Sequence, residues 1–348
     1  MSEISVPKHD ANALLHGEEP IIQEFLAPLA AGYPGAFGLK DDCATISPTP
    51  GHDIVVKTDP VAAGVHFLDG DPPSDIGWKA LAVNVSDLAA KGAVPRAYLM
   101  ALSFPEAPTR TWMNDFARGL GEAQTAFGMH LIGGDTDRRP GPVTVSIAVF
   151  GEVPTGTMVR RGTARAGDAL FVTGSLGQSA LGLRLLREPG LGGSWGLDAV
   201  AVGEAVERFR RPKPRLALRD PLRSFASAAM DLSDGLVKDL GRMCRASGCG
   251  AIVHADAVPR GKAGDAAVAH DAVHWGDILG SGDDYEVLVA VAPDKAGQFE
   301  AVANEAGQKA AMPFSVTRIG EMTAGRHVEM RDGHGQPIAL ARAGWDHF

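Results

Sequence analysis

Aspartate recurs at six places where a strand or helix is predicted to end, and these are the residues most able to do chemistry. A single aspartate in such a place is usually a turn former or a helix cap, because its side chain accepts from nearby backbone N–H groups. Six such places, several beside glycine, instead indicate a cluster of carboxylates that other groups can approach closely. The six are Asp41-Asp42, Thr58-Asp59, Asp87, Gly133-Gly134-Asp135-Thr136, Asp231-Leu232-Ser233-Asp234-Gly235 and Gly282-Asp283-Asp284.

A carboxylate cluster needs compensating cations, because like charges a few ångströms apart disfavour each other's ionisation. Magnesium suits such a site, since it takes hard oxygen ligands and leaves coordination positions for water and substrate phosphates. Magnesium can also bridge carboxylates to a polyphosphate and neutralise the charge that develops during phosphoryl transfer. The aspartate pattern therefore predicts a magnesium-dependent enzyme that moves a phosphoryl group from ATP to a small acceptor.

The common nucleotide-binding signatures are missing from the sequence, so ATP is expected to bind without them. There is no GxxxxGK[ST], no strand-linked GxGxxG and no HRD or DFG set. Arg160 and Arg161 are candidate phosphate contacts, although solvation at the surface is the commoner fate of an arginine. Ser233 is expected to cap a helix that begins at Asp234, and such a helix start could face phosphate.

No side chain in the sequence is marked as a covalent nucleophile. His66 suits a packed or loop histidine about as well as a substrate contact. Cys43, Cys244 and Cys249 have no base nearby in the sequence, and each is interpreted as a buried structural thiol. Direct transfer between donor and acceptor is the expectation.

Bulk properties agree with a cytoplasmic enzyme of two domains. The chain has 348 residues, which is too long for one typical hydrophobic core and so predicts two domains. The hydrophobic content of 45% supports that prediction. Its net charge of −9 argues against binding to nucleic acid or to an anionic membrane. The cysteines lack zinc-site spacing, the N-terminus has no apolar leader, and no apolar run approaches eighteen residues.

Strand-like and helix-like segments alternate along both halves, which predicts an α/β protein. A polar, glycine-rich stretch at 154–168 suggests domains at 1–153 and 154–348. The predicted strands are 53–58, 96–104, 129–132, 143–153, 168–173, 228–232 and 285–292. The predicted helices are 19–31, 75–91 and 109–127, and the predicted exposed loops are 188–197 and 259–266.

Taken in order, these motifs resemble the thiamine-monophosphate kinase family over nearly the whole chain. The resemblance rests on the aspartate motifs together with Gly64-Val65-His66-Phe67, the run 79–90 that contains Asp87, and the ending Gly344-Trp345-Asp346-His347-Phe348. It implies the fold of aminoimidazole ribonucleotide synthetase. That fold has an α+β N-terminal domain, which binds ATP and metal and pairs in a homodimer, followed by a mixed α/β C-terminal domain.

The resemblance also implies roles for individual residues. It implies ATP-dependent phosphorylation of thiamine monophosphate with several Mg²⁺ ions. The implied magnesium ligands are Asp42, Thr58, Asp59, Asp87, Asp135, Asp231 and Asp234. The implied ATP contacts are Gly134, Asp135, Arg160 and Ser233, and the implied substrate contacts are His66, Asp283 and Trp345.

The chain departs from the family pattern at a few positions near these residues. Lys40 stands where glycine is usual, and Lys57 stands where serine is common, so a lysine could replace part of a metal site. Asp283 gives a shorter carboxylate than the usual glutamate. The aromatic contact near the C-terminus is Trp345 unless Arg342 occupies the aligned place.

Two kinds of alternative remain open at this point. The first is another ATP-using enzyme of the same fold, such as aminoimidazole ribonucleotide synthetase, selenophosphate synthetase or the hydrogenase-maturation dehydratase. Selenophosphate synthetase would be expected to have a reactive cysteine or selenocysteine near the N-terminus. It is disfavoured because the first cysteine here, Cys43, lies inside the metal motif. The second is a non-catalytic nucleotide or metal sensor, for which Lys40 and Lys57 are the motivating residues.

Overall fold

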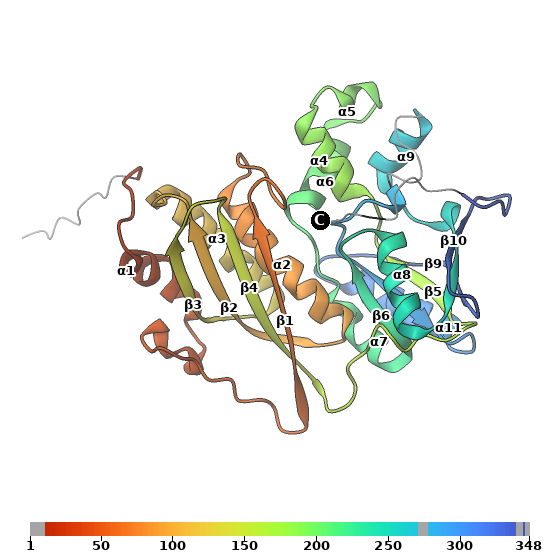
Figure 1. Ribbon diagram of the computed structural model, residues 1–348, viewed down its shortest axis with the longest axis horizontal. Helices are drawn as coiled ribbons and strands as arrows, with labels where there is room; N and C mark the ends of the chain where they lie inside the picture. The colour runs from red at the N-terminus through yellow and green to blue at the C-terminus, as the bar shows by residue number, and fades with distance from the viewer. Residues whose placement is uncertain (1–10, 271–277, 339–343, 345–348) are drawn as a thin grey trace, which may run out of the picture. The chain divides into compact units, whose positions relative to one another are not determined.

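The computed structural model describes residues 11–270, 278–338 and 344, and these residues form two compact units (Figure 1). Unit 1 comprises 1–47, 56–84 and 96–150, and unit 2 comprises 48–55, 85–95 and 151–348. The units are therefore interleaved along the chain, and the division into 1–153 and 154–348 stays a prediction. Among the described helices, none is long and apolar enough to cross a membrane.

A four-stranded sheet in the first half carries two of the aspartate motifs, Thr58-Asp59 on β1 and Gly133-Gly134-Asp135-Thr136 on β3, in the strand order β1-β4-β2-β3. Its strands are β1 His52–Ala62, β2 Val94–Phe104, β3 Leu131–Arg138 and β4 Thr144–Pro154. Helices α2 Pro73–Ala90 and α3 Arg110–Phe127 lie against one face of this sheet (Figure 1). The alternation of buried and half-buried residues along β4 shows that one face of the sheet forms a core.

Most predicted elements of this half are confirmed. The strands 53–58, 96–104 and 143–153 and the helices 75–91 and 109–127 correspond to β1, β2, β4, α2 and α3. Thr109 caps α3 by accepting from the N–H of Trp112 at 3.1 Å. The segment 19–31 forms consecutive short helical turns, α1 Glu18–Ile21, η1 Ile22–Leu26 and η2 Ala27–Ala30, and η3 Pro34–Leu39 follows them.

The strand predicted at 129–132 is wrong in its bounds. β3 begins at Leu131 and runs through the Gly-Gly-Asp-Thr motif, because pairing with β2 overrides the poor strand propensity of two glycines. Gly134 permits this pairing. A Cβ atom at Gly134 would lie 1.8 Å from the carbonyl oxygen of Met100, so only glycine fits there.

The second half is built on a six-stranded sheet in the order β10-β7-β9-β5-β8-β6. Alternate residues of β5 face two different cores: Leu170 and Val172 pack with α8, whereas Phe171 packs with Leu222 of α7 and Phe299 of α11. The sheet therefore has helices on both faces, and the predicted α/β class is confirmed. The strands are β5 Ala169–Thr173, β6 Ala226–Leu232, β7 Gly250–His254, β8 Glu286–Val291, β9 Val316–Thr323 and β10 Val328–Arg331.

The remaining helices include two corrections to the predicted loops. The segment 259–266 contributes to a helix, α9, and 188–197 contains one helical turn, α5, beside a buried Trp195. Small and glycine residues hid both elements from the helical pattern. The helices are α4 Gln178–Arg187, α5 Leu191–Ser194, α6 Ala199–Arg210, η4 Leu216–Leu218, α7 Arg219–Phe225, α8 Leu236–Ser247, η5 Ala255–Ala257, α9 Gly261–Ala269 and α11 Ala296–Lys309.

The start of α8 differs from the predicted cap. The helix begins at Leu236 after Gly235, whose φ of 109° suits glycine, and Ser233 does not cap it. Asp239 instead accepts from the backbone N–H groups of Ser233 at 3.0 Å and Asp234 at 2.9 Å. The predicted buried face of this helix, Leu236, Leu240 and Met243, is confirmed.

Candidate active site

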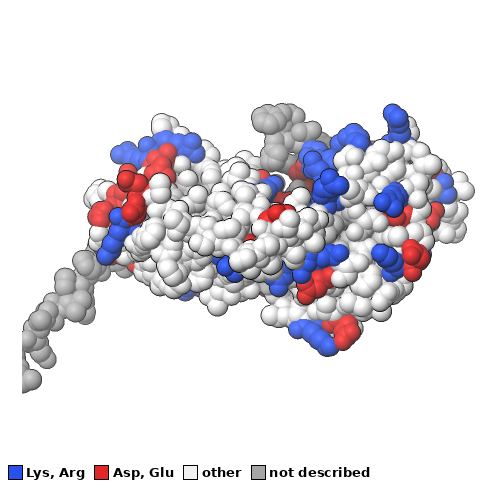
Figure 2. All heavy atoms as spheres, turned by 90° about the horizontal axis from the view of Figure 1, so that it is seen from below, with Lys and Arg blue, Asp and Glu red and all other residues white. Residues whose placement is uncertain are grey.

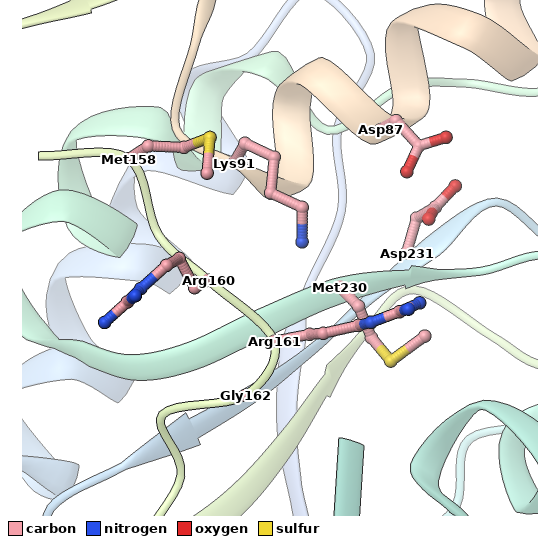
Figure 3. A pocket seen from close by; sticks show the side chains of 8 residues that line it. All are labelled: Asp87, Lys91, Met158, Arg160, Arg161, Gly162, Met230 and Asp231. Carbon is pink, nitrogen blue, oxygen red and sulfur yellow. The ribbon is translucent and has the colours of Figure 1, made fainter. Parts of the chain in front are cut away.

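A pocket of about 370 Å³ in unit 2 brings acidic and basic side chains together (Figure 3). Two carboxylates, from Asp87 and Asp231, point into the same part of this pocket in Figure 3. Two thioethers give it an apolar wall. Its lining residues are Asp87, Lys91, Met158, Arg160, Arg161, Gly162, Met230 and Asp231.

Three chain segments are tied together to build this pocket. Lys91, directly after α2, donates from Nζ to the carbonyl oxygen of Ala229 on β6 at 2.8 Å. Ala229 in turn donates its N–H to the carbonyl oxygen of Arg160 at 3.3 Å. Thr163 donates its hydroxyl to the Ser227 carbonyl oxygen at 2.6 Å. These bonds fix the basic segment 158–163 beside the strand that ends in Asp231.

The charges of the pocket suit a magnesium–polyphosphate complex. Carboxylate oxygens such as those of Asp87 and Asp231 are the ligands that magnesium prefers. Arg160 and Arg161 can donate to phosphate oxygens in a bidentate manner, and Lys91 can act as a point charge. The carboxylates of the pocket therefore fit the predicted magnesium, and its basic side chains fit the phosphates of the predicted ATP.

The two acidic loops of unit 2 contact each other directly. Asp283 donates its backbone N–H to the carbonyl oxygen of Ser233 at 2.7 Å, and Tyr285 donates to Leu232 at 2.9 Å. A Cβ atom at Gly282 would lie 2.2 Å from the Ser233 oxygen, so this approach requires glycine. The structure thus brings Ser233 and Asp234 close to Asp283.

Asp283 itself is held in an uncommon backbone conformation. Its φ of 72° is rare for a residue with a side chain. The hydroxyl of Ser179 donates to its Oδ2 at 2.9 Å. Several bonds around the loop therefore hold this carboxylate in place.

The neighbouring Asp284 is half-buried, and its side chain binds the backbone at the start of α4. Its carboxylate accepts from the backbone N–H of Gly177 at 2.8 Å and from that of Ser179 at 3.4 Å. Burial raises the pKa of Asp284 to about 8, against the opposing effect of these two backbone donors. These two bonds tie the loop that carries Asp284 to the start of α4.

In unit 1, strand β1 is fixed at Asp59 by a buried asparagine. Asp59 donates its backbone N–H to Oδ1 of Asn84 at 2.7 Å, and its carboxylate pairs with Lys57 at 3.0 Å. Thr58 donates its hydroxyl to the carbonyl oxygen of Ile147 at 3.0 Å. His66 accepts at Nδ1 from the N–H of Ala62 at 3.1 Å, a bond that holds a tight turn after β1.

The other unit 1 candidates are exposed to solvent. Asp42 lies in a bend, and Asp135 lies on β3, where its Oδ1 accepts from the N–H of Thr136 at 2.9 Å. Asp59 and Asp135 belong to opposite edges of the four-stranded sheet. Three inter-strand spacings place these edges roughly 14 Å apart, so one sheet does not bring the two carboxylates together.

The seven predicted ligands are divided between the two units: Asp42, Thr58, Asp59 and Asp135 belong to unit 1, and Asp87, Asp231 and Asp234 belong to unit 2. Within the ranges 11–270, 278–338 and 344, no group of three or more His, Cys, Asp or Glu side chains is positioned as a metal site. Cys244 and Cys249 are buried as predicted, but Cys43 is exposed, so the prediction of a buried thiol is wrong there. Trp345 and Arg342 lie outside the described residues.

Sequence reasoning missed several residues that the structure places in or around the site. Lys91 follows Asp87 by four residues, a helical spacing that could have placed both on one side. Lys238 follows Asp234 at the same spacing, and Arg242 follows Asp239 by three residues. Ser179, by contrast, meets Asp283 from 104 residues away, and no local pattern indicates that contact.

Two family models match the chain and define its structural class. They are AIR synthase related protein, N-terminal domain, over residues 40–153 and AIR synthase related protein, C-terminal domain, over residues 165–333. These spans cover all but the last residue of the four-stranded sheet and all of the six-stranded sheet. The fold is therefore that of the AIR synthase-related proteins.

Individual proteins and solved structures that resemble this chain identify one family within the AIR synthase-related class. Thiamine-monophosphate kinase of Caulobacter vibrioides is 37% identical over 337 residues, which is 94% of this chain and 89% of that protein. A crystal structure of thiamine-monophosphate kinase from Stenotrophomonas maltophilia matches with TM-score 0.73 and 35% identity, covering 86% of this chain and 91% of that one. AaThiL complexed with AMPPCP and TMP matches with TM-score 0.73 and 27% identity, covering 90% and 97%. The chain belongs to the thiamine-monophosphate kinase family.

The carboxyl group of Asp284 predicts a pH effect on stability. Its pKa is raised from 3.8 to about 8 in the folded protein, so folding favours the protonated form. The resulting stabilisation is complete below the unfolded pKa, declines as the pH rises toward 8, and does not change further above that. The free energy of unfolding should therefore fall between pH 5 and 8 more steeply in the wild type than in Asp284→Asn.

Urea unfolding at four pH values between 5 and 9 measures this difference, with the exposed Asp294→Asn as the control. The control should follow the wild type. Parallel pH dependence in the wild type and Asp284→Asn would show that the buried carboxyl is ionised throughout.

Proposed function

We propose that this chain transfers the γ-phosphoryl group of ATP directly to thiamine monophosphate, giving thiamine diphosphate. The observation that carries the proposal is the pocket that combines the carboxylates of Asp87 and Asp231 with Lys91, Arg160 and Arg161. Relatives spanning most of the chain support it through their names, and one related structure was solved with AMPPCP and TMP.

The carboxylates of this chain would hold magnesium in the proposed reaction. Asp87 and Asp231 are the ligands that the pocket supports, and Asp234 follows on the same loop. The bound ions would neutralise phosphate charge, including the charge that develops as the phosphoryl group moves. The proposed ligands outside this pocket are Asp42, Thr58, Asp59 and Asp135.

Other residues would orient the two substrates. Arg160 and Ser233 are the proposed ATP contacts from unit 2, and Gly134 and Asp135 are those from unit 1. Arg161 and Lys91 add positive charge next to the proposed phosphate positions. For the acceptor we propose His66 and Asp283, together with Trp345.

Direct transfer is favoured over a covalent intermediate. Burial raises the pKa of Cys244 to about 11, which disfavours the thiolate, and burial raises the pKa of Cys249 as well. The Nδ1 of His66 already accepts a backbone N–H. Alignment and charge neutralisation then account for catalysis without a phosphorylated protein.

A homodimer is part of the proposal, because Asp59 and Asp135 lie on opposite edges of one sheet. If one site uses both carboxylates, a second copy can supply the missing edge. The long edge strand β1 also leaves Val56 59% exposed, which a partner sheet would cover.

Neutralising either pocket carboxylate should abolish most of the activity. Asp87→Asn and Asp231→Asn keep the side-chain shape but remove a metal ligand's charge, so kcat/KM should fall about 100-fold or more. Thermal unfolding without metal should be unchanged or shifted upward, since one repulsive charge is gone. Asp294→Asn, in an exposed turn, serves as the control, and near-normal turnover in both pocket variants would refute these metal ligands.

Thiamine monophosphate should be a far better acceptor than thiamine, because its phosphate can share the cations of the site. The assay supplies ATP, magnesium and either acceptor, and it scores thiamine diphosphate or thiamine monophosphate as the product. With ATP of known chirality at the γ-phosphorus, direct transfer predicts inversion. Retention of configuration, a trapped phosphoprotein or faster turnover of thiamine would each contradict the proposed reaction.

Sedimentation velocity at micromolar concentration and neutral pH tests the dimer. The expected species has about twice the 36.3 kDa mass of the chain. The Val56→Lys substitution should weaken association of the two copies, because it places a charge on the exposed edge strand where two strands would pair. A fully active monomer would argue against a site shared between copies.

A further inference from the structure

Asp234 is engaged by two cations of its own chain. Nη2 of Arg242 lies 2.5 Å from its Oδ2, and Nζ of Lys238 lies 3.5 Å from the same oxygen. The carboxylate is largely buried, with 14% of its side chain exposed, so solvent screens these pairs only partly. Both cations therefore bind an oxygen that a metal ion would also need.

Arg242 is itself held in place by a second carboxylate. Its Nη1 lies 2.6 Å from Oδ1 of Asp239, whose side chain is fully buried. The other oxygen of Asp239 accepts from the backbone N–H groups of Ser233 and Asp234. The guanidinium thus spans two carboxylates, one of which is fixed to the loop that carries Asp234.

This arrangement differs from an ordinary surface ion pair. Lys57 and Asp59 also pair, but 33% of the lysine side chain and 44% of the aspartate side chain are exposed to solvent. Exposed pairs of this kind contribute little because each side chain loses freedom and water screens the charge. Arg242 has its rotamer fixed by Asp239, so its attraction for Asp234 is available at a lower entropic cost.

We infer that Arg242, anchored by Asp239, competes with a divalent cation for the Asp234 carboxylate and thereby sets the metal affinity of this loop. The inference rests on the proposed function, in which Asp234 is a magnesium ligand. A metal ion and the guanidinium cannot both occupy the same side of Oδ2. A metal ion that binds Oδ2 on this side breaks or lengthens the Arg242–Asp234 bond, while the Arg242–Asp239 bond can persist.

The test measures Mn²⁺ binding to the full-length protein by electron paramagnetic resonance of the free ion, without nucleotide. Arg242→Met removes the competing charge and keeps a long apolar stem, so it should bind Mn²⁺ roughly three- to tenfold more tightly than the wild type. The matched control is Arg245→Met on the same helix. Arg245 is exposed, so the same change in net charge there should alter the affinity less than about twofold.

Two further variants separate this inference from the proposed metal site. Asp234→Asn should weaken Mn²⁺ binding, and adding Arg242→Met to it should restore nothing, because the arginine acts through Asp234. If Asp234→Asn binds Mn²⁺ with the affinity of the wild type, the assignment of Asp234 as a metal ligand is refuted. Equal, weaker or undetectable binding in Arg242→Met, with weakened binding in Asp234→Asn, would refute only the competition.

If Arg242 only held the loop in place, Arg242→Met would loosen the loop and weaken Mn²⁺ binding, which is the opposite of the change that competition predicts. Circular dichroism and thermal unfolding confirm that each variant is folded. If Arg242→Met does not fold, Lys238→Met provides the decisive comparison, because Lys238 contacts the same oxygen of Asp234 at a longer distance. It should tighten Mn²⁺ binding by a smaller factor, and unchanged or weaker binding would overturn the inference.

Discussion

Repulsion among carboxylates is the constraint on which the site of this protein depends. Asp87 and Asp231 line one pocket, and Asp234 and Asp283 lie on adjoining loops of the same unit. Neighbouring carboxylates repel one another, and nearby cations offset that repulsion. On the face of the molecule drawn in Figure 2, which is mostly free of charged residues, Lys and Arg atoms lie beside Asp and Glu atoms in several separate patches. In the pocket, Lys91, Arg160 and Arg161 supply part of the compensation, which leaves a place for magnesium in the proposed reaction.

The backbone makes this charge arrangement possible by bringing loops unusually close together. Gly282 lets the loop that carries Asp283 contact the carbonyl of Ser233, and Gly134 lets β3 lie against Met100. Buried polar groups then fix these loops from behind: Asn84 holds strand β1 at Asp59, and Asp239 holds the backbone at Asp234. Of these positioning residues, Gly134 is also a proposed ATP contact, whereas Gly282, Asn84 and Asp239 have no predicted contact with either substrate.

The sequence predicted the elements with strong periodicity and the identity of the acidic motifs. Helices α2 and α3 and the strands β1, β2 and β4 have clear apolar patterns, and each was located within a few residues. The resemblance to a known family supplied the AIR synthase-related fold, which the comparisons confirm. Local patterns failed where long-range pairing decides the structure, as in β3, whose glycines are ordered by pairing with β2.

The same limit applies to the site. Spacing along a helix can suggest that Lys91 accompanies Asp87, but the bond from Lys91 to Ala229 spans 138 residues and follows only from the fold. The capping role predicted for Ser233 also failed, because the buried carboxylate of Asp239 binds the loop backbone instead. Sequence indicates which residues can bind metal and phosphate, whereas their compensation by neighbouring cations is a property of the folded chain.

The most direct test of this account is to locate the metal in crystals grown with Mn²⁺ and a non-hydrolysable ATP analogue. Anomalous scattering marks manganese independently of the protein and the nucleotide. The account predicts a peak bound by carboxylate oxygens of both Asp87 and Asp231, at about 2.0–2.2 Å, and shared with a phosphate oxygen. Nucleotide bound to Lys91, Arg160 and Arg161 with no manganese at either carboxylate would contradict it.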